Sequence, residues 1–272
     1  MKILFLCPRW GSQSALPPEE FVRRVAAEGY DGIEIGFDDG DHRDEGIPAL
    51  ARQAGLMVVT QHFATFATDV DTHCREFEER LRRAASFRPQ FINSQTGRDL
   101  FDLERNMRVF DVADRVAADT GVPIFHETHR ARCLHTPWRT AELLHAKPGT
   151  RLVLDMSHWC NVCESLLADQ AGVIASILPA VEHIHARVGH AQGPQVSDPR
   201  APEWQDALDA HLVWWDRIVA AKRESGAAQL TFTPEFGPPP YFPTLPWTQM
   251  PVASQWDINV HMMRLLRDRH AR

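Results

Sequence analysis

Residues 122–158 read VPIFHETHRARCLHTPWRTAELLHAKPGTRLVLDMSH and contain a strand, a helix and a second strand in that order. Val122–Glu127 is rich in the branched and aromatic residues that strands favour. Thr136-Pro137 predicts the start of a helix through Leu144, because threonine caps helices well and proline suits the first turn. Arg151–Leu154 is again short and apolar, so the stretch is typical of one βα unit followed by the strand of the next.

The same unit recurs along the whole chain. Strands are expected to begin near residues 2, 32, 57, 90, 122, 151, 181 and 229, each followed by a segment with helical periodicity. Eight such units in about 250 residues are typical of a TIM barrel. The alternative, an open doubly wound sheet, usually has a glycine-rich phosphate-binding turn after its first strand, and residues 7–11 (CPRWG) are not such a turn. We therefore predict that residues 1–272 form a single (β/α)8 TIM-barrel domain of the α/β class.

The composition is that of an ordinary globular protein. Of the 272 residues, 44% are apolar and 24% are charged, which excludes a disordered chain, a coiled coil and a disulfide-stapled miniprotein. The formal net charge of −7 provides no global positive field for nucleic acid or an anionic membrane, so a small molecule is the expected partner. The 14 histidines raise the expectation of metal ligation.

Targeting signals and cysteines favour a cytoplasmic location. The apolar stretch Ile3–Cys7 is shorter than the roughly 7–15 residues of a signal-peptide core. The longest uncharged apolar run, Ala171–Val181, is about half of the ~20 residues that a membrane helix needs. The 5 cysteines, an odd number, indicate reduced thiols. Cys160 and Cys163 have CxxC spacing but no second pair, so ordinary thiols are favoured over a redox dithiol or a zinc site.

In a TIM barrel the chemistry takes place where the strands end. Nearly every predicted strand here ends in a polar or ionisable side chain, and the set comprises Arg9, Trp10, Glu34, His62, Asn93, Gln95, Glu127, His129, Asp155, His158, His185, Arg187 and Glu235. A general rise in polarity at strand ends accounts for one or two such residues. It does not account for potential metal ligands at the ends of four successive strands.

Those four residues are Glu127, Asp155, His185 and Glu235. Carboxylate oxygens with one imidazole suit Mn²⁺, Mg²⁺, Co²⁺ or Zn²⁺, and no thiolate converges with them. Asp155 and Glu235 directly follow apolar runs, where a buried carboxylate is costly without a metal or another positive partner. We expect one divalent ion, with Mn²⁺ the favoured identity.

The alternation of side chains along a strand separates ligands from packed histidines. The sequence HETH around Glu127 differs from the zinc-protease helix motif, which needs two histidines at i and i+4. In a strand Glu127 and His129 share one face, whereas His126 points to the other and is expected to be packed or to support the site. His183 and His185 also share a face, and His185 lies nearer the strand end, so it is the expected ligand.

Taken together, the strand ends resemble those of the xylose-isomerase-like TIM barrels, the sugar phosphate isomerase/epimerase superfamily. The matching strings are Gly32-Ile-Glu-Ile, His126-Glu-Thr-His, Leu154-Asp-Met-Ser-His158, Glu182-His-Ile-His185 and Pro234-Glu-Phe-Gly. The resemblance covers nearly the whole chain, and the order and spacing of the strings are more specific than any one of them.

The resemblance implies a divalent metal held by the four residues named above, and two glutamates, Glu127 and Glu235, that exchange a substrate proton. It also implies substrate contacts at His158 and His62. Ketose epimerases of this group carry a substrate-binding arginine some residues after the metal histidine, and Arg187 is the candidate here although its spacing differs. Trp10 and His129 complete the expected substrate contacts.

The leading hypothesis is therefore a metal-dependent isomerase or epimerase of a sugar or related polyol ketone, working through a metal-stabilised enediolate. A lyase or dehydratase acting on a keto-sugar or keto-inositol is the alternative, because the same groups can expel a β-hydroxyl. An abasic-site endonuclease and a non-catalytic sugar-binding protein are further alternatives. The proline-rich segment Gly237–Pro243 is expected to wall the pocket, to form an interface of a homo-oligomer or to be a plain surface loop.

Overall fold

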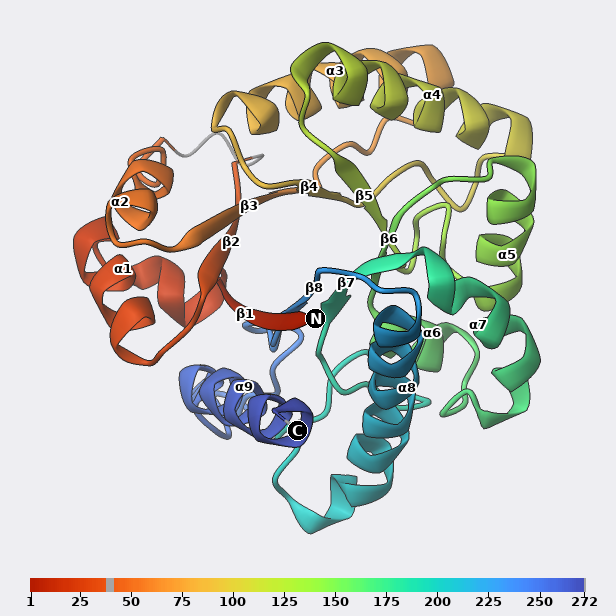
Figure 1. Ribbon diagram of the computed structural model, residues 1–272. Helices are drawn as coiled ribbons and strands as arrows, with labels where there is room; N and C mark the ends of the chain where they lie inside the picture. The colour runs from red at the N-terminus through yellow and green to blue at the C-terminus, as the bar shows by residue number, and fades with distance from the viewer. Residues whose placement is uncertain (38–41, 272) are drawn as a thin grey trace.

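A computed structural model describes residues 1–37 and 42–271 of the chain. Its parallel strands close into a barrel in sequence order, and the last strand pairs with the first (Figure 1). The strands are β1 Lys2–Pro8, β2 Gly32–Gly36, β3 Met57–His62, β4 Ile92–Ser94, β5 Ile124–Glu127, β6 Leu152–Leu154, β7 Val181–His185 and β8 Gln229–Thr233. The predicted (β/α)8 TIM barrel is thereby confirmed.

Helices surround the barrel on its outer side (Figure 1). They are α1 Pro18–Ala27, α2 Ile47–Gln53, α3 Val70–Ser86, α4 Leu103–Thr120, α5 Pro137–Ala146, α6 Met156–Val162, α7 Ala171–Ile177, α8 Gln205–Glu224 and α9 Gln255–His270. As predicted, Thr136 caps α5 and accepts a hydrogen bond from the backbone N–H of Arg139. Helix α6 was not predicted, because it starts directly after β6 with no linker to signal it.

The barrel interior is filled by apolar side chains that alternate with the outward-facing ones. Leu6, Val59 and Phe91 are buried there, with Met57 and Phe125 packed against them. A larger apolar layer lies between the strands and the helices. Packing in the two layers fixes the position of each strand along the barrel axis, and this sets where the residues at the strand ends lie.

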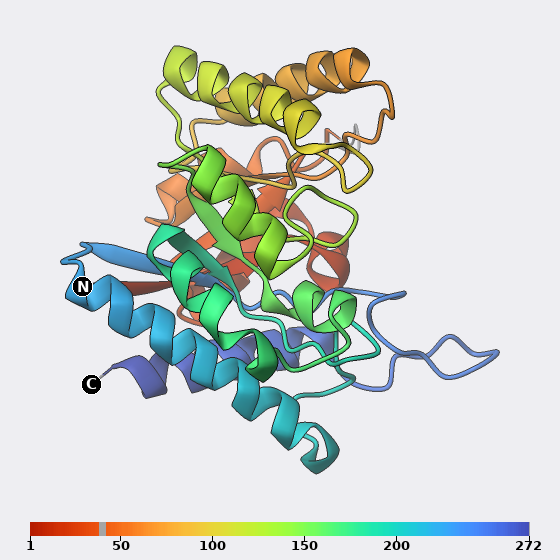
Figure 2. The same ribbon diagram turned by 90° about the vertical axis from the view of Figure 1, so that its right-hand side faces the viewer.

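The two ends of the barrel differ. Figure 2 shows both termini at one end, and a long segment between β8 and α9 that extends from the opposite end. Trp247 in this segment is 77% exposed, whereas Tyr241 near its start lines a cavity. In residues 1–37 and 42–271 no helix has the length and apolar character of a membrane span.

Candidate metal and substrate site

Four strand ends bring potential ligands together. Each of Glu127, Asp155, His185 and Glu235 offers one ligand atom, and these atoms all lie within 4.8 Å of one another. All four residues are buried. They come from β5, the end of β6, β7 and the segment just after β8, so separate rigid strands hold them. The structure therefore gathers the four residues that were predicted as metal ligands.

The orientation of His185 fits a bound cation. Its Nε2 lies 3.0 Å from Oε1 of Glu34, while its Nδ1 lies 2.9 Å from Oε2 of Glu235 and 3.6 Å from Oε1 of Glu127. Among the described residues, His185 Nδ1 and Glu127 Oε1 are buried without an aligned hydrogen-bond partner. Such buried polar atoms remain unsatisfied unless a cation lies between them, which can be a proton on His185 or a metal ion that displaces it.

Glu34, which was noted only as one polar strand end, is the residue that orients His185. It points into the barrel from β2 and lies 3.2 Å from His183 Nε2. Asn93 Nδ2 donates to it at 2.9 Å and Thr233 Oγ1 at 2.5 Å. In metal sites a carboxylate on the second ring nitrogen fixes the histidine tautomer, and Glu34 on Nε2 would leave His185 Nδ1 free for a ligand role. The sequence did carry a signal, since Glu34 is the one charge within an otherwise apolar strand.

Burial and the surrounding charges together push the pKa values of the two glutamates apart. Burial opposes ionisation of Glu127, yet the neighbouring His185 lowers its pKa to about 2. Burial raises the pKa of Glu235 above its ordinary value, although His185 and Arg187 act against this rise. Burial opposes the charge on His185, but Glu235, Glu34 and Glu127 raise its pKa well above the usual range. Such divergence is typical of paired acid and base groups.

Arg187 lies against this cluster and is fully buried. Its Nη2 donates to Asp155 and lies 2.7 Å from His158 Nε2, and its Nε donates to Ser157 Oγ at 3.1 Å. Its Nη1 is 3.5 Å from Oε2 of Glu235. The guanidinium thus offsets part of the negative charge, and it also lines the cavity where a substrate would lie.

His158 and His129 form a neutral pair beside Glu127. His158 lies in the first turn of α6, and the ring centroids of the two histidines are 3.8 Å apart. Burial lowers the pKa of His129 to about 4 and lowers that of His158 well below its usual value. Because Arg187 donates to His158 Nε2, the neutral ring carries its hydrogen on Nδ1, which has no partner among the described residues. This N–H is enclosed by protein, since His158 is fully buried and is not among the described residues that line the cavity above the cluster.

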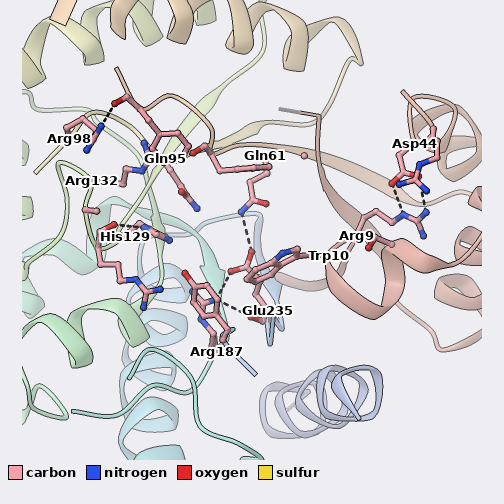
Figure 3. A pocket seen from close by; sticks show the side chains of 18 residues that line it. Arg9, Trp10, Asp44, Gln61, Gln95, Arg98, His129, Arg132, Arg187 and Glu235 are labelled. Atoms are coloured by element: carbon pink, nitrogen blue, oxygen red, sulfur yellow. Dashed lines mark hydrogen bonds and ion pairs between the residues drawn. The ribbon is translucent and has the colours of Figure 1, made fainter. Parts of the chain in front are cut away.

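A cavity of about 740 Å³ opens above the cluster (Figure 3). Trp10, Gln61, His129, Arg187, Glu235 and Tyr241 are among the residues that line it. Figure 3 shows His129 and Arg98 on one side, Trp10 on the other, and Glu235 between them. The volume suits a small ligand. Trp10, His129 and Arg187 therefore lie where substrate contacts were predicted.

The structure differs from the prediction at His62. Its ring points out of the barrel towards α3, with Nδ1 3.2 Å from Ser94 Oγ and Nε2 2.7 Å from Thr65 Oγ1. The preceding residue, Gln61, faces inwards and donates from Nε2 to Oε1 of Glu235 at 3.2 Å. Successive residues of a strand point to opposite faces, so the two cannot both reach the cavity.

By sequence, no family model and no curated protein matches the chain. Solved structures do match. A 3-keto-D-glucoside 4-epimerase from E. coli is 14% identical, with 98% of this chain and 100% of that one covered and a TM-score of 0.66. A probable 3-DHS dehydratase from Bacillus anthracis is 17% identical, with 99% and 100% covered and a TM-score of 0.61.

A third match is a xylose isomerase-like TIM barrel protein from Mycobacterium smegmatis, solved in complex with magnesium. It is 14% identical, with 87% of this chain and 91% of that one covered and a TM-score of 0.58. At such identities the likeness establishes the fold. The resemblance seen at the strand ends is thereby confirmed at this level, and the chain has the fold of the xylose isomerase-like TIM barrels and sugar phosphate isomerases/epimerases.

Proposed function

We propose that the protein is a divalent-metal-dependent isomerase or epimerase that acts on a sugar or related polyol ketone. The observation that carries the proposal is the convergence of His185 Nδ1 and Glu127 Oε1, both buried and without an aligned hydrogen bond, beside the Glu235 carboxylate. Glu127, Asp155, His185 and Glu235 would hold the ion. The epimerase with a similar fold and the magnesium complex support this assignment.

The charges of the cluster favour a divalent cation. Four buried carboxylates, Glu34, Glu127, Asp155 and Glu235, face two cationic side chains, Arg187 and a protonated His185. Buried negative charge in excess is costly. A divalent ion that displaces the proton of His185 reduces the excess, and Mn²⁺ suits the oxygen-rich ligand set, with Zn²⁺, Mg²⁺ or Co²⁺ as alternatives.

The two glutamates carry the proton chemistry in this proposal. A bound ion would supply Lewis acidity towards a carbonyl oxygen. Glu127, held ionised by its low pKa, accepts the proton next to the carbonyl. Glu235, whose pKa burial raises, returns a proton from another side, because it follows β8 whereas Glu127 ends β5, three strands away around the barrel. Gln61, which lines the cavity, holds the Glu235 carboxylate in place by donating a hydrogen bond to it.

Metal analysis followed by deuterium exchange tests the proposal. We expect about one divalent ion per chain in the purified protein, and an anomalous signal between the four ligands in crystals soaked with Mn²⁺. With the metal present, a ketose from a sugar panel should take up solvent deuterium at the carbon next to its carbonyl. Absence of the ion from the cluster, or of exchange across the panel in the metal-loaded protein, would contradict it.

Dehydration is the second candidate. The same cluster of carboxylates can expel a β-hydroxyl, and a probable 3-DHS dehydratase has a similar fold. Mass spectrometry separates the two reactions, since elimination removes 18 Da from the product whereas isomerisation leaves its mass unchanged.

A small molecule is the proposed partner, and nucleic acid is not. The net charge of −7 opposes association with DNA, although an endonuclease role would also use a metal cluster. Binding of an abasic duplex at physiological salt would contradict this part of the proposal.

A further inference from the structure

The cavity above the acidic cluster is lined by an unusual number of arginines. Among its described lining residues are two carboxylates, Asp44 and Glu235, and six arginines, namely Arg9, Arg43, Arg98, Arg130, Arg132 and Arg187. Some of these arginines have a clear structural role. Arg9 forms a two-pronged salt bridge with Asp44, and Arg187 belongs to the acidic cluster.

Arg98 and Arg130 stand apart because neither forms an ion pair within the part of the chain that the structure describes. Arg98 donates one guanidinium N–H to the backbone oxygen of Phe66, and its Nε is buried without a partner. An unsatisfied buried donor costs free energy unless a ligand or water accepts its hydrogen bond. Arg98 therefore lines the cavity with a guanidinium charge that no carboxylate of the described residues neutralises.

The backbone of Arg98 is held in place for this role. Asn106, which is buried, accepts a hydrogen bond from the Arg98 backbone N–H at 3.0 Å and donates to its backbone oxygen at 2.9 Å. Gly97 precedes it with a φ of 67°, and a Cβ there would lie 2.2 Å from Asn106 Oδ1. Only glycine fits this turn, so the position of Arg98 is set by the fold and not by solvent.

Arg130 is positioned just as specifically. The backbone oxygen of Arg130 lies 2.6 Å from the ring nitrogen Nδ1 of His129 and forms a hydrogen bond with it. Its guanidinium lies over the Tyr241 ring, 4.7 Å from the centroid, and the guanidinium of Arg187 lies 4.9 Å from the same centroid. The aromatic ring thus holds a second cation at the cavity without neutralising it.

From these contacts we infer that the cavity recognises a small polyhydroxy ligand that carries an anionic group, a carboxylate or a phosphate, which Arg98 and Arg130 bind. The guanidinium group matches both anions with paired hydrogen bonds. In a cavity of about 740 Å³, a sugar acid or sugar phosphate can reach the arginines while its carbonyl end faces Glu235. The sugar part of this inference rests on the proposed function, whereas the anion part rests on the arginines alone.

Calorimetric binding of three non-reacting probes tests the inference in the full-length, Mn²⁺-loaded protein. The probes share a six-carbon polyol chain: glucitol is neutral, gluconate carries a carboxylate and glucitol 6-phosphate carries a phosphate. We expect at least one anionic probe to bind about tenfold more tightly than glucitol, and the tighter of the two identifies the anion. Since no turnover is measured, failure of the proposed reaction would leave this result unaffected.

Arg98→Gln and Arg130→Gln should each weaken the preferred anionic probe about tenfold and leave glucitol unchanged. Arg105→Gln is the matched control, because Arg105 is exposed on α4 outside the cavity lining and pairs with Asp102 at 3.8 Å. Circular dichroism checks that each variant is folded. Equal affinities for the three probes, or a preference for the anionic probes that both cavity variants retain in full, would overturn the inference.

Discussion

The floor of the cavity and its arginine wall are built in different ways. Here the floor means the buried cluster beneath the cavity, whose residues lie on or directly after strands and of which Glu235 lines the cavity; its members are Glu34, Glu127, Asp155, His185 and Glu235. The wall consists of Arg98 and Arg130, which lie on the loops after β4 and β5 and are only partly buried. Strand register sets the floor, whereas single side-chain contacts set the wall. Changes in the floor should therefore abolish the chemistry, and changes in the wall should alter affinity.

The largest effect is expected from Asp155→Asn and His185→Ala. Each removes a ligand, so metal affinity should fall by more than the roughly 100-fold that changes around the ligands produce, and activity should disappear. The apolar barrel layers do not depend on these side chains, so circular dichroism should show a folded protein. Metal content is measured by elemental analysis. Either variant active at the wild-type rate without its metal would refute the ligand assignment.

Glu127→Gln and Glu235→Gln should separate chemistry from metal holding. An amide retains a neutral oxygen ligand but cannot accept or return the proton, so solvent exchange should fall by about 10²–10⁴-fold. Metal occupancy should decrease less than in Asp155→Asn. Deuterium uptake and metal content are measured on the same preparation. If a glutamine variant exchanges at the wild-type rate, that glutamate is a ligand only.

Glu34→Gln tests the part of the floor that does not touch the ion. The amide contacts His185 more weakly and no longer fixes its tautomer, so metal affinity should fall about 10–100-fold. At saturating metal the turnover should return towards wild type, which distinguishes positioning from catalysis. Glu19→Gln, in the exposed first turn of α1, is the control. A turnover defect that excess metal does not correct would contradict this role.

Next to the arginine wall, Tyr241→Leu removes the aromatic ring that the guanidinium of Arg130 packs against. A cation–π contact at a partly exposed site contributes about 0.5–1 kcal/mol, so KM should rise roughly two- to fivefold with kcat little changed. Steady-state kinetics on the identified substrate measures both constants. A large loss of kcat would show instead that the main role of the ring is its contact with the Arg187 guanidinium, 4.9 Å from its centroid.

The smallest effect on activity is expected at His62. His62→Leu leaves Ser94 and Thr65 without their buried partner, so the free energy of unfolding should drop by about 1–3 kcal/mol while kcat stays near wild type. Gln61→Leu, one residue earlier, should lower kcat and leave the free energy of unfolding near wild type, because it removes the hydrogen bond to Glu235. Chemical denaturation and kinetics are measured on both variants. A kcat defect in His62→Leu alone would restore His62 as a substrate contact.

The strand ends could be predicted because one rule covers them. Parallel strands of a barrel end at the same face, so Glu127, Asp155, His185 and Glu235 were expected to meet, and they do. His126 was expected to face away from Glu127, and it bonds Thr96 at 2.7 Å outside the cavity. For these residues, the position of each strand end and the alternation of side chains along the strand were sufficient to predict the side chain's direction.

Other features could not be predicted, because the local sequence does not show which residues of a strand point inwards or which distant residue a side chain contacts. Met57–His62 (MVVTQH) is apolar on both faces, so its alternation does not reveal whether Gln61 or His62 points inwards. The role of Glu34 became visible only when β2 and β7 placed it 3.0 Å from His185. Helix α6 was missed because Asp155, a predicted ligand, also caps it by accepting from the Ser157 N–H.

By itself, the sequence determined the repeated strand–helix unit, the barrel and the order of the ligands, since hydrophobic periodicity and strand length are local properties of the chain. Only the tertiary structure decided which side chains share the cavity. Arg98 and Arg130 are 32 residues apart in numbering and lie on different loops, yet both line it. Their meeting depends on closure of the barrel, on the hydrogen bond that Asn106 accepts from the Arg98 backbone, and on the Tyr241 ring under Arg130. No local sequence pattern encodes such contacts between separate segments.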